Sequence, residues 1–201
     1  MVKLVLYHIN KNIKGQLMNK KALVILASGF EEIEAVTPID LLKRAGIDVT
    51  VCGVGEKSIT GGRAKITVVT EKNIADISED FDAIILPGGM PGAANLAASP
   101  KVNELITKAH QTKKIIAAIC ASPVIVLTPL GILKNKTATC FPGMEKDFHP
   151  TTTFKKQSTV VDGNIITSQG AGTSFDFSLK IIEQLLGIEA VKKVKIATVA
   201  D

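Results

Sequence analysis

Short apolar runs alternate with longer amphipathic stretches along most of the chain. The runs at 22–27, 83–86 and 115–119 contain only apolar residues and have the length of strands. Because neither face of such a run is polar, the pattern predicts strands that helices cover on both sides. Weaker strand patterns lie at 47–51, 57–70, 137–140, 158–161 and 165–168, the second of them bent around a pair of glycines.

The stretches between these runs have the apolar spacing of helices. Ser28 and Glu31 stand three positions apart, as in a capping box, and predict a helix that ends before Gly46. Further helices are predicted over 100–111, 122–130 and 173–186. Such alternation predicts an α/β sandwich with a mainly parallel central sheet, whose ligand sites lie at the carboxyl ends of the strands.

The composition favours one domain over residues 19–201, because 46% of the residues are hydrophobic and no long polar linker interrupts the alternation. Residues 1–18 are interpreted as an N-terminal extension, since Met18 looks like a second start just before the first strand. The apolar runs are far shorter than the roughly 18 residues of a membrane-spanning helix. We therefore expect no membrane span.

The chain carries 24 basic and 19 acidic residues, a formal net charge of +5. Three of the lysines belong to the extension, so the excess of basic residues is partly a property of that segment. With one Tyr and no Trp, the chain has little aromatic surface for stacking on bases. Nucleic acid is therefore not an expected partner.

Three cysteines are spread widely along the chain, without any C-x-x-C pair: Cys52, Cys120 and Cys140. This odd number and spacing argue against a disulfide framework and against a zinc site. They favour a reducing compartment, and we expect no metal site. One free thiol still calls for a chemical explanation.

Cys120 lies between an apolar strand and a predicted helix that opens with Ser122 and Pro123. A strand, a sharp turn and a helix form the geometry of a nucleophile elbow. At that place the helix dipole and nearby backbone N–H groups would favour the thiolate. The alternative is that Cys120 is a small buried apolar residue, as most intracellular cysteines are. The surroundings of Cys52 and Cys140 favour a structural role, and the alternative for Cys140, next to Phe141, is a place at the rim of the pocket.

Two other strand ends bring further groups toward the same edge of the sheet. Gly88 and Gly89 let the backbone approach a bound group closely, so that the N–H groups of Gly89 and Ala121 form a candidate oxyanion hole. Glu34 lies one turn into the first helix and is a candidate proton carrier beside the thiol. The alternatives are an ordinary turn for the glycines and a favourable helix-dipole contact for the acids.

A cysteine peptidase or amidase would need a histidine to activate the thiol. The histidines are His8, His110 and His149, and none is adjacent to Cys120. His149 is the one with a chance of reaching the pocket, since His8 belongs to the extension and His110 ends a predicted helix. This class of function is therefore the least favoured.

Four segments in the same order resemble the ThiJ/PfpI superfamily, in particular the branch that contains the parkinsonism-associated protein deglycase and its bacterial homologues. The resemblance runs from about Lys20 to the C-terminus. The segments are ALVILASGFEEIEAVTPIDLLKRAGIDVTV, AIILPGGMPGAANL, IIAAICASPVIVL and SQGAGTSFDFSLKIIEQLLG.

This resemblance implies a flavodoxin-like three-layer α/β sandwich that forms a cytoplasmic homodimer. It implies that Cys120 is the reactive cysteine and Glu34 the glutamate that shares its proton, with Gly89 and Ala121 around the sulfur. Arg44 and Arg63 resemble basic residues near the pocket or the dimer surface. The implied substrates are reactive dicarbonyls such as methylglyoxal, or glycated adducts, converted without a cofactor.

Three positions depart from the pattern of the superfamily. Ala121 stands where the protease-like branch has histidine, which disfavours a Cys–His peptidase. Phe141 stands where some relatives have a histidine near the pocket, and Ala171 stands where many have proline. A second function remains open beside the enzyme: the same cysteine serves as a redox sensor or in a redox-regulated chaperone.

Overall fold

The computed structural model describes residues 20–200, so the predicted extension at 1–18 lies outside the described part of the chain. The central sheet contains β1 (Lys21–Leu26), β2 (Asp48–Gly53), β5 (Lys72–Asn73), β6 (Ala83–Leu86), β7 (Ile115–Ile119), β10 (Thr159–Asp162) and β11 (Ile165–Ser168). Their order across the sheet is β10-β11-β7-β6-β1-β2-β5, and every neighbouring pair is parallel except β10 with β11. Two small sheets lie beside it, an antiparallel pair of β3 (Ser58–Thr60) with β4 (Thr67–Val69) and a parallel pair of β8 (Thr137–Ala138) with β9 (Thr153–Phe154).

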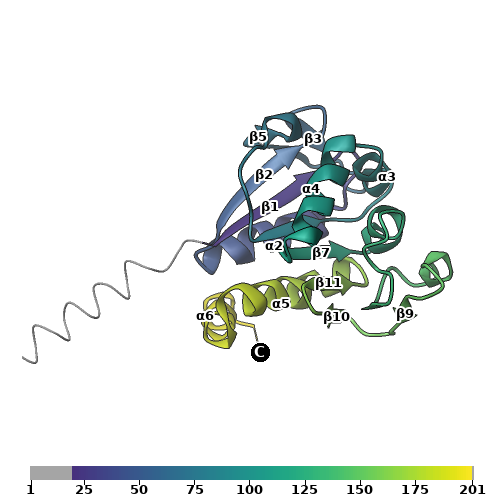
Figure 1. The fold of residues 1–201 in the computed structure, drawn as a ribbon. Helices are drawn as coiled ribbons and strands as arrows, with labels where there is room; N and C mark the ends of the chain where they lie inside the picture. The colour runs from purple at the N-terminus through teal and green to yellow at the C-terminus, as the bar shows by residue number, and fades with distance from the viewer. Residues whose placement is uncertain (1–19, 201) are drawn as a thin grey trace, which may run out of the picture.

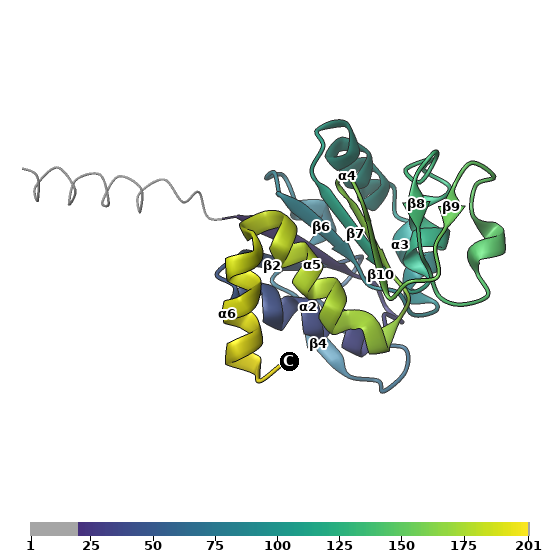
Figure 2. The ribbon, with the colours of Figure 1, turned by 90° about the horizontal axis from the view of Figure 1, so that it is seen from below.

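Helices cover both faces of the central sheet. One face carries α3 (Gly92–Ala97) and α4 (Pro100–Gln111), and the other carries α2 (Glu32–Arg44), α5 (Ser174–Leu186) and α6 (Ile188–Thr198). Helix α5 packs against both α2 and α6, as Figure 2 shows, whereas α4 lies across the opposite face in Figure 1. The predicted flavodoxin-like three-layer sandwich with a mainly parallel sheet is confirmed.

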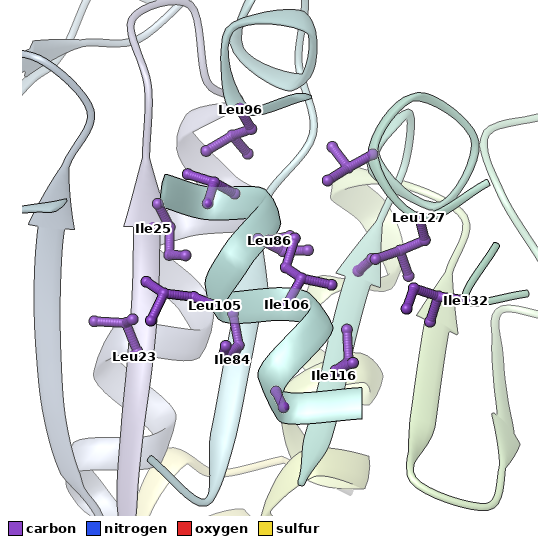
Figure 3. Packing of buried hydrophobic residues seen from close by; sticks show 14 of the residues in the cluster. Leu23, Ile25, Ile84, Leu86, Leu96, Leu105, Ile106, Ile116, Leu127 and Ile132 are labelled. Carbon is purple, nitrogen blue, oxygen red and sulfur yellow. The ribbon is translucent and has the colours of Figure 1, made fainter. Parts of the chain in front are cut away.

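The apolar runs explain why the sheet is buried on both faces. In β1, Leu23 and Ile25 point to one apolar cluster while Val24 and Leu26 point to the other. Figure 3 shows the first cluster, where Leu105 and Ile106 of α4 and neighbouring side chains pack over the strands. Both faces of β1 are therefore apolar, and each packs against a layer of helices. A strand in which polar and apolar residues alternate would bury polar side chains on one of these faces.

Several elements differ from the sequence predictions. Glu31, not Ser28, caps α2: its backbone is extended and its carboxylate accepts the N–H of Glu34 at 2.8 Å. The helix predicted over 122–130 is a single five-residue π-helical segment, Pro123–Leu127, followed by turns. Helices α3 and α6 were not predicted, because α3 is short and rich in Gly and Ala and α6 follows α5 after one glycine.

The order of the strands fixes where a site can form. The chain leaves β1 toward β2 and β5 on one side, and then returns to place β6 and β7 on the other side. The carboxyl ends of β1 and β6 therefore lie at a topological switch point, where open α/β sheets bind ligands. Within residues 20–200, no helix is both long and apolar enough to cross a bilayer.

Candidate active site around Cys120

Cys120 occupies a sharp bend immediately after β7. Its φ is +64°, a left-handed conformation that costs a residue with a Cβ about 1–2 kcal/mol. Two hydrogen bonds hold the bend: the Cys120 N–H donates to the carbonyl of Ser168 at 2.9 Å, and the Cys120 carbonyl accepts the N–H of Phe141 at 2.9 Å. The predicted elbow is therefore present, and the sulfur is half-buried rather than enclosed.

The helix after the elbow is weaker than the sequence suggests. The π-helical segment Pro123–Leu127 is five residues long, and the Ser122 side chain makes no capping hydrogen bond. A dipole from so short a helix is small. Individual backbone groups act on the sulfur instead, because the N–H groups of Gly89 and Ala121 lower the pKa of the Cys120 thiol.

The turn after β6 approaches Cys120 so closely that a side chain would not fit. A Cβ placed on Gly88 would lie 2.7 Å from Cβ of Cys120 and 2.8 Å from Oε2 of Glu34. Gly89 has a φ of +85°, and a Cβ there would lie 2.5 Å from the backbone nitrogen of Glu31. Glycine is thus required at both positions by close approach, and at Gly89 also by conformation.

Glu34 reaches the same point from the first turn of α2. Its side chain is only 1% exposed, and its Oε2 accepts the N–H of Gly88 at 2.8 Å. The Cys120 side chain also acts on this carboxyl group and lowers its pKa. The structure thus brings Glu34, Gly88, Gly89 and Ala121 together around Cys120.

Burial and mutual charge control the protonation of the pair. Burial raises the pKa of Glu34 to about 7, although hydrogen bonds from Cys120 and Gly88 lower it. Burial and then the charge of Glu34 raise the pKa of Cys120 to about 12, although the N–H groups of Gly89 and Ala121 lower it. The pair therefore releases one proton near neutral pH and holds a second one that the two groups share.

This result corrects one expectation. The elbow was predicted to lower the pKa of the Cys120 thiol through the helix dipole, whereas burial and the adjacent carboxylate raise it.

Phe141 and Gly170 line the outer side of the site. Phe141 is 48% exposed, and its ring carbon Cδ2 lies 3.6 Å from the position that a Cβ on Gly170 would take. Oε1 of Glu34 lies 3.9 Å from the same position. The aromatic ring, the glycine backbone and the carboxyl group therefore meet at one end of the site.

The two arginines predicted near the pocket or the dimer surface make no contact with Cys120 or Glu34 within this chain. Arg44 ends α2, about 15 Å along the helix axis from Glu34, and its Nε bonds Asp40 at 2.7 Å. Arg63 is exposed in the loop between β3 and β4, and neighbouring Ala64 donates its N–H to Oε1 of Glu32 at 2.7 Å. Neither guanidinium group has a contact that joins it to Cys120.

No imidazole in residues 20–200 bonds to Cys120 or Glu34. Nδ1 of His149 instead contacts Oγ1 of Thr151 at 2.9 Å, and His110 lies at the end of α4 on the other face of the sheet. His8 lies outside the described residues. The Cys–His arrangement of a peptidase is therefore not built around this thiol.

The other two cysteines are structurally distinct from Cys120. Cys52 and Cys140 are fully buried in the apolar cluster beneath α4, and burial raises the pKa of each to about 12. Cys120 packs against the cluster on the opposite face. Cys140 precedes Phe141 but packs into the cluster on the opposite face of the sheet from the one that Cys120 contacts.

One contact of the site was not predicted from the sequence. Ser122 was assigned to a helix cap, yet its buried hydroxyl donates to the carbonyl of Pro87 at 2.6 Å. Strand β11 ends at Ser168, and the loop that follows it contains Gly170 and Ala171. Oγ1 of Thr173 holds this loop, since it donates to the carbonyl of Gly170 and lies 2.7 Å from Oγ of Ser168.

Across residues 20–200, no group of three or more His, Cys, Asp and Glu side chains is arranged to hold a metal ion. The chemistry that this arrangement can perform is attack by sulfur on an electrophilic carbon, with proton transfer by Glu34 and two N–H donors beside the developing charge.

Comparison with known proteins finds relatives of this chain. The Parkinson disease protein 7 homolog of Danio rerio is 41% identical over 180 residues, which cover 88% of this chain and 95% of the relative. The glutathione-independent glyoxalase DJR-1.2 of Caenorhabditis elegans is 33% identical over 172 residues, 85% of this chain and 91% of the relative.

Solved structures agree with the fold. The crystal structure of Drosophila melanogaster DJ-1beta is 36% identical, has a TM-score of 0.88, and is matched over 92% of this chain and 100% of that one. Oxidized DJ-1 of Toxoplasma gondii is 34% identical with a TM-score of 0.87, over 90% and 98% of the two chains. The family model described as DJ-1/PfpI matches residues 20–184, so the chain belongs to the DJ-1/PfpI family.

Proposed function

We propose that this protein is a cofactor-independent glyoxalase or deglycase that converts reactive dicarbonyls, or their early adducts on proteins, to hydroxy acids. The observation that carries the proposal is the buried carboxyl group of Glu34 beside Cys120: Oε2 of Glu34 and Cβ of Cys120 lie 2.8 and 2.7 Å from the position that a Cβ on Gly88 would take. The glyoxalase name of the Caenorhabditis relative supports the same class of reaction.

In the first step, Sγ of Cys120 attacks the aldehyde carbon of methylglyoxal while the thiol proton passes to the Glu34 carboxylate. The carbonyl oxygen takes the electron pair and is stabilised by the N–H groups of Gly89 and Ala121. Protonation of that oxygen gives a hemithioacetal and regenerates the carboxylate. The raised pKa of Glu34 suits it to accept and return a proton near neutral pH.

In the second step, Glu34 removes the hydrogen on the carbon bound to sulfur, and the electron pair forms an enediolate with the adjacent ketone. Glu34 returns this proton to the former ketone carbon, and the hydroxyl proton on the carbon bound to sulfur passes to the former ketone oxygen, which leaves a thioester of lactate on Cys120. Water then cleaves the thioester and releases lactate and the free thiol. The sum is methylglyoxal plus water giving lactic acid, with no external oxidant or reductant.

The proposal is tested by measuring lactate formed from methylglyoxal without glutathione. We expect turnover by the wild type and none by Cys120→Ala. A matched control is Cys52→Ala, which removes a thiol from the other face of the sheet and should keep the rate per folded molecule. Absence of lactate with the wild type, or wild-type turnover by Cys120→Ala, contradicts the enzymatic proposal.

A second proposed function is redox sensing, either alone or as the switch of a chaperone. Cys120 is half-buried and has a carboxyl donor and two N–H donors beside its sulfur, groups that suit the oxygens of a sulfinate. The oxidized Toxoplasma relative is consistent with this chemistry. Mild peroxide followed by mass spectrometry should add oxygen to Cys120 before Cys52 or Cys140, and equal oxidation of all three would contradict it.

We also propose a homodimer, built on apolar side chains exposed along α2 and beside β4. Ile33 is 54% and Val36 46% exposed on α2, while Ile66 and Val69 are 53% and 74% exposed on the hairpin. Sedimentation should give the mass of two chains, and Val36→Glu should halve it. A wild type that sediments as one chain would disprove this assembly.

The proposed location is the cytoplasm, supported by the cysteines. Cys52, Cys120 and Cys140 are all free thiols. Free thiols persist in reducing compartments. Fractionation of cells that express the protein, with detection in the cytosolic fraction, is the direct measurement.

A further inference from the structure

Ser122 is a buried polar side chain that the proposed mechanism does not use. It is fully buried beside the elbow and does not cap the segment that follows it. Its Oγ donates to the carbonyl oxygen of Pro87 at 2.6 Å, across the gap between two loops. A buried hydroxyl aimed at one carbonyl is a specific connection, because an unpaired partner at this depth is costly.

The carbonyl that Ser122 binds belongs to the same peptide group as the donor to Glu34. The C=O of Pro87 and the N–H of Gly88 share one planar unit, and this N–H donates to Oε2 of Glu34 at 2.8 Å. A hydrogen bond to the oxygen of a peptide polarises its N–H and strengthens the next bond in the series. Ser122 is therefore linked to the carboxyl group through one peptide.

We propose that Ser122 is a positioning residue for Glu34, which orients and polarises the Pro87–Gly88 peptide so that its N–H stabilises the carboxylate form of the proton carrier. Ser122 does not touch the reacting atoms, and its effect passes entirely through that peptide. The inference deepens the proposed function, since it rests on Glu34 as the group that moves the proton.

The direction of the effect follows from the sign of the interaction. Without the Ser122 hydroxyl, the Gly88 N–H is a weaker and less fixed donor, so the Glu34 carboxylate loses stabilisation relative to the carboxylic acid. The midpoint of the Glu34 titration should then move upward. Because polarisation changes a hydrogen bond by roughly 10–30%, the expected shift is a few tenths of a pH unit.

The experiment follows the Glu34 carboxyl carbon by ¹³C NMR against pH, in protein labelled at glutamate. It is done in the Cys120→Ala background, where no thiol exchanges a proton with Glu34 and the charge that still acts on its carboxyl group is that of Glu31, which is the same in every variant compared. The variant is Ser122→Ala. The matched control is Ser178→Ala, which removes an equally buried hydroxyl that donates to a carbonyl, Ser174 at 2.7 Å, within α5.

An upward shift with Ser122→Ala and no shift with Ser178→Ala supports the proposal. An unchanged midpoint with Ser122→Ala overturns it, as does an equal shift in both variants, which would reflect general loosening. If Ser122→Ala does not fold, the ¹³Cβ shift of Ser122 in the Cys120→Ala protein decides. That shift should titrate with the Glu34 midpoint, and a flat Ser122 signal overturns the proposal.

Activity gives a separate arm of the test. In the background that retains Cys120, Ser122→Ala should move the pH profile of methylglyoxal turnover in the same direction, while Ser178→Ala should not. If the wild type forms no lactate, the proposed function fails while the NMR titration still decides the role of Ser122. If lactate forms and the titration is unaffected by Ser122→Ala, this inference alone fails.

Discussion

Gly88→Ala is the substitution that tests the geometry of the site most directly. The new Cβ would lie 2.7 Å from Cβ of Cys120, 2.8 Å from Oε2 of Glu34 and 2.9 Å from the carbonyl oxygen of Ile119. Ordinary carbon contacts are about 3.5–4.0 Å, so the turn and the elbow must separate by close to 1 Å. One of these neighbours is backbone, so a change of side-chain rotamer cannot remove the clash.

The expected cost has two parts of different size. Overpacking a rigid site destabilises a protein by about 1–3 kcal/mol, which corresponds to roughly 2–12 °C in melting temperature for a chain of this size. Misplacing reacting groups by about 1 Å lowers a rate by about 100-fold. Activity should therefore fall much further than the folded fraction at 25 °C.

The assay pairs lactate formation with thermal melting, and uses Gly172→Ala as its control. A Cβ on Gly172, in the loop after β11, has nothing within 4 Å, so this variant should keep both activity and stability. The reasoning is refuted if Gly88→Ala turns over methylglyoxal at the wild-type rate, because the site would then tolerate a separation that the geometry forbids.

Three further predictions concern charge, access and packing. Burial raises the pKa of Glu34 from 4.5 to about 7, so its protonated form favours the fold; the contribution is complete below pH 4.5 and is lost as the pH rises through 7. In urea denaturation, the free energy of unfolding of Glu34→Gln should therefore rise by about 3 kcal/mol relative to that of the wild type between pH 4.5 and pH 7.5. A difference between the two proteins that does not change with pH would contradict the raised pKa of Glu34. Phe141→Ala should speed alkylation of Cys120 by bulky maleimides more than by iodoacetamide, because the ring limits access to the sulfur. The cost in stability should stay below about 2 kcal/mol, since the ring is half-exposed. Equal acceleration with both reagents would show that the ring does not limit access. Ile85→Val, in the fully buried β6, should cost about 0.5–1.5 kcal/mol in urea melts with turnover unchanged, and a large loss of turnover would mean that the core couples to the site.

The layers of the fold follow from the sequence because the apolar runs are unambiguous. The predicted strands at 83–86, 115–119 and 165–168 have the observed bounds, since each run is flanked by residues that cannot extend it. Helix α4 likewise begins at Pro100 and ends at Gln111 as predicted. Two errors concern helix caps, where a local pattern competes with tertiary contacts. Ser28 and Ser122 each stand just before a predicted helix, as capping residues do, but neither caps one in the structure.

The site was predictable as far as it depends on residue type at strand ends. Cys120, Glu34 and the Gly88–Gly89 turn share one edge because parallel strands end there. The sequence could not give the protonation of the pair, because the pKa values depend on burial and on a contact across 86 positions of the chain, from 34 to 120. The role of the Ser122 hydroxyl likewise depends on which peptide group lies opposite it.

Enzyme and sensor are not independent hypotheses, because both begin at the same sulfur. A sulfinate on Cys120 cannot form the hemithioacetal and thioester of the proposed mechanism, because these need the thiol, so every oxidised molecule is lost to turnover. Stepwise peroxide treatment should therefore lower methylglyoxal turnover in direct proportion to the oxidised fraction of Cys120 measured by mass spectrometry. Turnover that survives complete oxidation would assign catalysis to another group, whereas loss of turnover before oxidation would show that damage elsewhere unfolds the site. A linear relation through zero would make the redox state of Cys120 a control on the enzyme.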